Sequence, residues 1–433
     1  MNLGQIIDRC GSILDYAPSL TSYRHEVRDI VNMVYLEMFG ERPFQFAQKT
    51  VKVKAYSDIT AANAITLHAG TNKITAVGTF ASYMEGMVLA VTGSTTATNN
   101  GEYIIRHIDG ASDAYVENED ESLPVFTADA TTGNPSLGVK VKHRYIDLPQ
   151  DCIQPLAVGI RQPGNAASQP IEYLTMFLDE ALNLDLDEVS KPTEFIHMSP
   201  MNVLGPPRAP NTAIAGAGAN VPDAGAYDAV YTVMNLGRES SPSPVAPFSN
   251  LTTANKLQIN TMLVQEINSG RVKKIYVRGP VSDAFYYVGQ VDEATTSIDV
   301  TLASSPSYLT DRNTYPKLPE NDGLYSRIRM YPRQDSDYDI TVRYLYRPEK
   351  LLDESDVPAL PAGNHIYLVY RTCQELFSKH ANVTQSQFYQ MKADRELQNI
   401  INRHLSQKTA FYVKGPFRAG SMFNRPMPVL THS

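Results

Sequence analysis

The hydrophobic pattern of this 433-residue chain is helical at both ends and strand-like in between, which limits how the chain can fold. Near the N-terminus, five apolar residues recur three or four positions apart: Val27, Ile30, Val31, Val34 and Met38. This spacing predicts an amphipathic helix that begins near Thr21 or Ser22 and ends near Gly40. A shorter helix is predicted over residues 3–14.

Two further helices are predicted near the C-terminus. The segment HIYLVYRTCQELFSKHA places five residues on one helical face: Ile366, Val369, Cys373, Leu376 and Phe377. The next segment, residues 384–407, begins with a capping-box pattern from Thr384 to Gln387 and then has apolar residues at helical spacing. Two alternating runs, SRIRMYP and YDITVRYLYRP, precede these helices and predict β-strands.

Between the helical ends, two stretches have the pattern of all-β domains. Strict alternation starts at Val51 in VKVKAY, and short alternating runs continue to residue 141, with a hairpin turn expected at Asn100-Gly101. This stretch, residues 51–141, predicts a small barrel or sandwich. Residues 227–318 contain several short strands and an expected exposed turn, Gly-Arg-Glu-Ser, which favour an immunoglobulin- or fibronectin-like sandwich. The chain has no tryptophan, so an antibody-type core is not expected.

The remaining segments complete an α+β organisation. HRYIDLPQDCIQPLAVGIR predicts an extended segment, and residues 172–197 have helix-like runs interrupted by leucines that alternate. The fold class is therefore predicted as α+β, a helical core formed by both chain ends and the middle segment, with two all-β domains inserted into it. The predicted parts are core 1–50, β domain 51–141, core 142–204, linker 205–226, β domain 227–318, core 319–407 with two strands and a helix pair, and a C-terminal tail 408–433.

Composition excludes several functional classes. A formal net charge of −8 argues against a protein that coats nucleic acid, because phosphate binding needs a basic surface. The three cysteines, Cys10, Cys152 and Cys373, are far apart, which predicts buried free thiols and neither a disulfide framework nor a zinc site. The sequence shows no signal-peptide pattern and no apolar run long enough to cross a bilayer, so a soluble protein made in a reducing compartment is expected.

Carboxylates and histidines provide the candidates for chemistry. The loop LLDESDVPALP contains Asp353, Glu354 and Asp356, but it lacks the alternate ligand spacing, glycine bend and distal carboxylate of a calcium loop. The alternative interpretation is a polar loop before a helix N-terminus, where the helix dipole favours negative charge. The run DSDYD starts like an EF-hand but continues with Ile340 at the sixth position, so a hairpin turn is expected there.

The sequence contains no recognisable catalytic motif. His365, His380 and His404 lie on the predicted C-terminal helices without the spacing that places two ligands on one helical turn. GxSxG, P-loop and dinucleotide-binding patterns are absent from the sequence. The prediction is a non-enzymatic protein with no catalytic residues, no metal ligands and no cofactor. A Ser/His/Asp triad dispersed along the chain stays open as an alternative.

The C-terminal tail predicts a docking segment. Residues 408–433 contain four Lys or Arg residues, four aromatic residues, three prolines and two glycines, and no Asp or Glu. Aromatic side chains fill pockets on a partner and arginines bind its carboxylates. The residues predicted to bind the partner are Phe411, Tyr412, Lys414, Phe417, Arg418, Phe423 and Arg425. A frayed terminus and contact with DNA phosphates are the alternatives.

Two phrases resemble a known family. The order of N-terminal helices, RYIDLPQDCIQPLAVGIR, YRPEKLLDESDVPALP and a helix pair resembles the head-to-tail connector (adaptor, or head completion) proteins of tailed bacteriophages. The matching pieces are Ile146–Asp151 and Tyr346–Pro361, and YTVMNLGRESSPSPV resembles small β-sandwich modules of phage virion proteins. The two β insertions depart from the smallest family members, which are compact and mostly helical.

This resemblance implies a structural role in the virion. It implies a homo-oligomeric ring of about twelve copies under the portal protein, in the neck of the virion, after synthesis in the host cytoplasm. The ring would join head to tail, bind downstream tail or nozzle proteins, and let genomic DNA pass without sequence-specific binding and without membrane contact. The family commonly attaches to the portal through the C-terminal segment. The β insertions would project outward toward tail fibres, neighbouring copies or host glycans.

Other functions remain as alternatives to the connector. One is a tail-tube or fibre-anchoring ring protein of the same virion. Another is an adhesion protein whose β modules bind carbohydrate, although the lack of tryptophan argues against aromatic sugar platforms. The dispersed hydrolase triad is the third.

Overall fold

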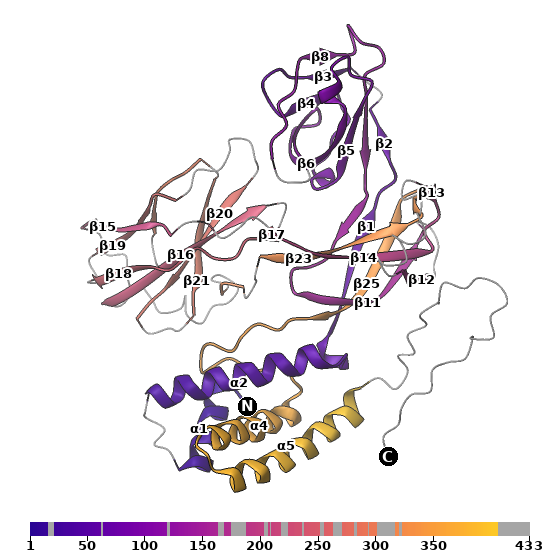
Figure 1. Ribbon diagram of the computed structural model, residues 1–433. Helices are drawn as coiled ribbons and strands as arrows, with labels where there is room; N and C mark the ends of the chain where they lie inside the picture. Colours follow the sequence, from indigo (N-terminus) through magenta and orange to yellow (C-terminus); the bar gives the residue numbers. More distant parts are fainter. Residues whose placement is uncertain are drawn as a thin grey trace, which may run out of the picture.

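The chain is an α+β protein (Figure 1). The computed structural model describes residues 1–15, 21–61, 64–118, 122–162, 169–174, 188–202, 207, 209–217, 224–235, 238–251, 255–262, 271–280, 284–292, 294–300, 317–319 and 323–405. The predicted tail and all seven of its predicted binding residues lie outside the described residues. All three cysteines are buried and free, which confirms the prediction made for them.

Helices from the two ends of the chain share one hydrophobic core, the helical unit. It consists of α1 (Leu3–Leu14), α2 (Thr21–Glu41), α4 (His365–Lys379) and α5 (Val383–His404). These bounds confirm the predicted helices. The predicted capping box from Thr384 to Gln387 is wrong, because α5 begins one residue earlier and Asn382 is its N-cap, accepting a hydrogen bond from the Gln385 amide at 3.2 Å. The described residues also include the short 3-10 helices η1 (Gln45–Ala47), η2 (Ser82–Met84), η3 (Ala97–Asn99) and η5 (Ala362–Asn364).

A seven-stranded central sheet lies next to the helical unit (Figure 1). Its strands, in spatial order, are β1 (Gln48–Ala55), β25 (Tyr338–Tyr346), β11 (Cys152–Arg161), β12 (Gln169–Leu174), β14 (Glu194–Asn202), β23 (Leu324–Tyr331) and β10 (Tyr145–Asp147). Neighbouring strands of this sheet pair antiparallel except β12 with β14, and β13 (Val189–Ser190) pairs in parallel with β24 (Arg333–Gln334). One buried cluster joins strands from the early, middle and late parts of the chain.

The central sheet corrects three sequence predictions. Val51–Ala55 is predicted as part of the first β domain, but β1 pairs with β25 because its apolar face packs in the central-sheet core. The described parts of residues 172–197 contain strands and no helix, since Ile171 and Phe195 are buried in that core, and residues 175–187 lie outside the described residues. DSDYD does not form a hairpin turn, because the flanking strands β23 and β25 are separated by β11, β12 and β14.

An eight-stranded sheet forms the body drawn at the top of Figure 1. In spatial order it contains β2 (Ile59–Thr60), β9 (Gly138–Lys142), β5 (Val88–Thr92), β6 (Gly101–Asp109), β7 (Asp113–Glu117), β4 (Lys73–Ala76), β3 (Ile65–Leu67) and β8 (Asp129–Ala130). The predicted turn at Asn100-Gly101 is wrong. Asn100 ends a longer connection, where its side chain bonds the Ser94 backbone, and the tight hairpin turn lies at Gly110, which has φ 68°.

Two further sheets share one core and form the two-sheet unit. The smaller sheet contains β15 (Asn211–Ala217), β19 (Asn255–Asn260) and β22 (Ile298–Val300). The larger sheet contains β17 (Arg238–Glu239), β16 (Gly225–Asn235), β20 (Val272–Arg278), β21 (Tyr286–Asp292) and β18 (Ala246–Leu251). The predicted linker 205–226 is therefore wrong over Asn211–Ala217, because this Ala-rich segment finds strand partners in β19.

The eight-stranded sheet joins the central sheet at His143. The backbone N–H of Tyr56 donates to His143 Nδ1 at 2.9 Å. The Gln334 side-chain amide donates to the backbone carbonyls of Tyr56 and His143. Burial lowers the pKa of His143 to about 4, although the nearby charge of Asp337 acts in the opposite direction. The imidazole is therefore neutral and accepts a hydrogen bond at this junction.

We expect acid to destabilise the junction through His143. The unfolded chain binds the proton near pH 6.5 and the folded chain only near pH 4, so stability falls as the pH falls between these values. The full loss is about 3 kcal/mol. Urea unfolding of the wild type and of His143→Asn, which keeps an acceptor and does not titrate, measures it. Equal pH dependence of the two proteins over this window would contradict the prediction.

Candidate functional site

The acidic loop, Leu351–Pro361, leads from the central sheet to the helical unit and is held by α1 and α2. The Asn32 side chain exchanges two hydrogen bonds of 2.8 Å with the backbone of Leu351. The amides of Leu3 and Gly4 donate to the backbone carbonyls of Asp356 and Glu354 at 2.8 and 2.9 Å. Because the first N–H groups of a helix have no partner within the helix, the loop provides the acceptors that α1 needs.

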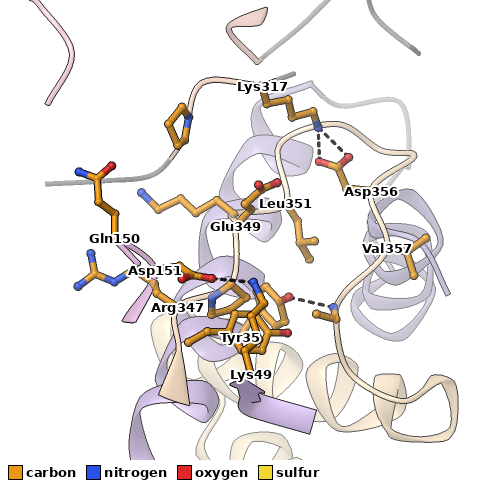
Figure 2. Close-up of a pocket in the computed structure, with 15 residues that line it drawn as sticks. Tyr35, Lys49, Gln150, Asp151, Lys317, Arg347, Glu349, Leu351, Asp356 and Val357 are labelled. Atoms are coloured by element: carbon orange, nitrogen blue, oxygen red, sulfur yellow. Dashed lines mark hydrogen bonds and ion pairs between the residues drawn. The ribbon is translucent and has the colours of Figure 1, made fainter. Parts of the chain in front are cut away.

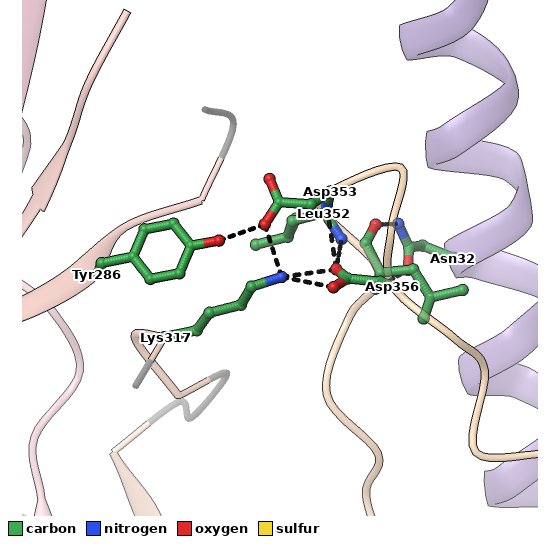
Figure 3. Close-up of polar contacts among 7 residues, drawn as sticks. Asn32, Tyr286, Lys317, Leu352, Asp353 and Asp356 are labelled. Atoms are coloured by element: carbon green, nitrogen blue, oxygen red, sulfur yellow. Dashed lines mark hydrogen bonds and ion pairs between the residues drawn. The ribbon is translucent and has the colours of Figure 1, made fainter. Parts of the chain in front are cut away.

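Each of the three loop carboxylates pairs with a cation, and Asp353 and Asp356 share one. Asp356 is 3% exposed, and both of its oxygens lie 2.7 Å from Lys317 Nζ (Figure 3). Asp353 lies 2.8 Å from the same ammonium, and Glu354 lies 2.6 Å from Arg24 on α2. Asp356 also accepts the amides of Leu352 and Asp353, at 2.8 and 2.9 Å.

These contacts change the interpretation of the loop. The prediction that its acids favour a helix N-terminus is replaced by pairing with Lys317 and Arg24, and the first turn of α4 contains no acidic residue. Among the described residues, no group of three or more His, Cys, Asp or Glu side chains is arranged to hold a metal ion. A cation from the protein itself occupies the position that a metal ion would need beside Asp353 and Asp356.

Lys317 connects the acidic loop to the two-sheet unit. It forms an isolated β-bridge with Tyr286, which lies at the start of β21. The Tyr286 hydroxyl donates to Asp353 at 2.5 Å, and its ring packs with Leu352 (Figure 3). One ammonium and one phenol of the two-sheet unit therefore hold two carboxylates of the loop.

A cavity of about 350 Å³ lies beside this contact, between the helical unit, the central sheet and Lys317 (Figure 2). Both acidic and basic side chains line the cavity, and among them Lys49 pairs with Asp151 at 2.6 Å. Tyr35 accepts the Ala359 amide at 2.9 Å, and burial raises the pKa of Tyr35 to about 12. The described lining residues include no Ser, Thr, Cys or His, so the cavity does not assemble a nucleophile with an imidazole base.

A second contact of the two-sheet unit is made by Arg238 and Glu239. The predicted exposed Gly-Arg-Glu-Ser turn is wrong at these two residues, because both are buried. The Arg238 guanidinium pairs with Asp147 and lies 3.8 Å from the centre of the Tyr325 ring. The Gln150 side chain exchanges hydrogen bonds of 2.7 and 3.0 Å with the Glu239 backbone. Arg238 thus binds the central sheet through a strand-end aspartate.

The Glu239 carboxylate is surrounded by donors within the two-sheet unit. It accepts from the Thr232 hydroxyl at 2.6 Å, from the Tyr276 hydroxyl at 2.5 Å and from Lys274 at 3.2 Å. Burial raises the pKa of Tyr276 and the neighbouring carboxylate raises it further, so the phenol stays protonated and donates. Burial also lowers the pKa of Arg238 to about 10.

A third contact links the two-sheet unit to the eight-stranded sheet. Glu117 on β7 lies 2.9 Å from Arg106 and 3.7 Å from Arg271, which precedes β20. All three side chains are buried. The two-sheet unit is therefore held by charged contacts to the acidic loop, the central sheet and the eight-stranded sheet.

The histidines considered as ligands do not gather. His365 receives the Met1 amino group on Nδ1 at 2.7 Å, and its Nε2 lies 2.9 Å from the Leu360 carbonyl. The ring of His404 packs edge-on against Phe46, while the His380 amide donates to the Leu376 carbonyl at the end of α4.

Sequence reasoning missed Lys317, Arg238 and Glu239, and the one signal in the sequence was that Arg-Glu interrupts an otherwise apolar β region.

No protein-family model matches the chain, and searches of curated proteins and of solved structures returned no match either. None of the described helices combines the length and the apolar character needed to cross a bilayer.

Proposed function

We propose that this chain is a structural virion protein, a head-to-tail adaptor whose copies form a ring that joins the portal to the tail and lines the DNA channel. One observation carries the proposal. The two phrases that resemble the connector family, Ile146–Asp151 and Tyr346–Pro361, both lie at contacts between the parts of the molecule. Asp147 binds Arg238 of the two-sheet unit, and Asp356 binds Lys317.

This use of the conspicuous carboxylates favours assembly over catalysis. In a catalytic site, a carboxylate would be positioned to exchange protons with a substrate in a cleft. Here Asp147 and Asp356 are engaged by cations from another part of the same chain, which fixes the relative position of those parts. A ring that transmits force between head and tail needs such a rigid multi-part subunit. In this proposal, the helical unit is the adaptor core, and the two β bodies are insertions that face neighbouring virion proteins.

The tail is proposed to bind the portal. Leu405, the last described residue, forms a β-bridge with Phe44, so the tail continues from the helical unit. The tail's basic and aromatic composition suits a docking segment that orders on a partner.

Mixing the purified chain with the portal of its phage tests the proposal. We expect the full chain to join the portal as a ring, and deletion of residues 408–433 to abolish binding while leaving the unfolding transition of the rest unchanged. A narrower variant replaces only the four tail aromatics by alanine, keeps the tail length and charge, and should also lose portal binding. In infected cells, the deletion should give heads without tails. Assembled particles that lack only fibres would favour the fibre-anchoring alternative, and undiminished portal binding would contradict the assignment of the tail.

A further inference from the structure

Helix α5 presents an apolar and basic face to solvent. It packs on α4 through Ala393 and Ile400, which are buried. The opposite face contains Phe388 and Met391, which are 44% and 65% exposed, followed by the exposed Arg395. Lys392 lies 4.3 Å from the centre of the Phe388 ring and adds a second cation at this edge. An exposed aromatic and methionine flanked by cations is the composition of an interface.

Helix α2 presents the complementary face. It also packs on α4, and Figure 1 shows α2 and α5 on either side of α4. The solvent side of α2 has Met33, which is 51% exposed, with Asp29 and Glu37 one helical turn before and after it. Asp29 lies 3.5 Å from Arg28 at one side of this face and remains exposed.

We propose that the solvent face of α5 in one copy packs against the solvent face of α2 in the next copy. Met33 would contact Phe388 and Met391, while Asp29 and Glu37 would face Lys392 and Arg395. The two patches match in length, because Asp29 to Glu37 spans about 12 Å of helix and Phe388 to Arg395 about 10 Å. An apolar centre with opposite charges at the rim excludes water at the middle and selects one register.

The occupant is a second copy because the two complementary faces belong to different sides of one helical unit. Such a contact is heterologous: each copy uses α5 toward one neighbour and α2 toward the other, which gives a closed ring or an open filament. Ring closure is the only element that rests on the proposed function, and the pairing of the faces stands on α2 and α5 alone.

A charge-swap experiment on the full chain tests the contact. Sedimentation velocity should show concentration-dependent self-association of the wild type. Glu37→Lys and Arg395→Glu should each weaken it by about tenfold or more, because each brings like charges together. An equimolar mixture of the two variants should recover association, since the introduced lysine then faces the introduced glutamate and the native pair forms at the other junction. Asp109→Lys, at the exposed end of β6 in the eight-stranded sheet, is the matched control and should change nothing.

The outcomes separate this contact from the proposed function. Unaffected self-association of both variants, or a mixture that does not recover, overturns the α2–α5 pairing while portal binding continues to support an adaptor. A wild type that stays monomeric at every concentration also overturns the pairing. Charge-dependent self-association in a chain that ignores the portal upholds the pairing and removes the adaptor role. Equal thermal unfolding of the variants, expected for exposed residues, excludes misfolding as the cause.

Discussion

Lys317→Met is expected to lower the free energy of unfolding by about 3 kcal/mol and to loosen the two-sheet unit from the acidic loop. The substitution removes the ammonium that pairs with both Asp353 and Asp356, and the carboxylate of Asp356 is almost entirely buried. A carboxylate that loses its cation inside the protein keeps its desolvation cost and loses the attraction that offset it. Methionine keeps most of the side-chain length, so the change isolates the charge.

Lys49→Met provides the matched control. Lys49 lines the same cavity and pairs with Asp151 at 2.6 Å, a distance similar to those of Lys317, but its side chain is half exposed. A solvent-exposed pair contributes at most about 1 kcal/mol. Chemical denaturation of both variants compares the two pairs directly. Equal effects would show that burial of Asp356 does not determine the strength of the Lys317 contact.

The double variant Lys317→Met with Asp356→Asn is expected to recover part of the loss. The asparagine carries no charge and still accepts the amides of Leu352 and Asp353, which Asp356 accepts in the wild type. Together with the single variant Asp356→Asn, the recovery gives the coupling between Lys317 and Asp356. Protease cleavage in the loops around the two-sheet unit should increase in Lys317→Met and return toward the wild-type rate in the double variant.

Glu239→Ala is expected to cost about 3 kcal/mol, because it leaves two buried hydroxyl donors without their shared acceptor. These donors are Thr232 and Tyr276, and the raised pKa of Tyr276 keeps its phenol protonated throughout the physiological range. The two-sheet unit should unfold at lower denaturant concentration, since Thr232 and Tyr276 lie in its paired strands β16 and β20.

Glu239→Gln separates the hydrogen bonds from the charge. Its amide oxygen can still accept from both hydroxyls, which share one oxygen of Glu239 in the wild type, so we expect a loss of only about 1 kcal/mol, mainly from Lys274. Glu349→Ala, at an exposed position of the chain, is the control for removing a carboxylate and should be nearly neutral. An alanine variant as stable as the glutamine variant would contradict the role given to Glu239 as a shared acceptor.

The helices and the presence of β bodies could be predicted because each depends on local periodicity. Val27 to Met38 and Ile366 to Phe377 repeat at helical spacing, and their burial against one another follows from that repeat. The strand partners could not be predicted, because β1 and β25 are far apart in sequence and alternation alone does not identify a neighbour. The contacts of Arg238 and Lys317 are made with carboxylates distant in sequence, so Arg238 was expected in an exposed turn and no local pattern identified Lys317.

The pairing of Gln48 with Leu345 has a consequence for the order in which the chain folds. The strands of the eight-stranded sheet all lie between Ile59 and Lys142, in the first third of the chain. This sheet can therefore form while the ribosome is still adding later residues. The central sheet and the helical unit must wait for β25, α4 and α5, so β1 and α2 expose apolar surface during most of synthesis. Nascent copies are therefore most vulnerable to aggregation and to chaperone capture at their first fifty-five residues, until the last strand arrives.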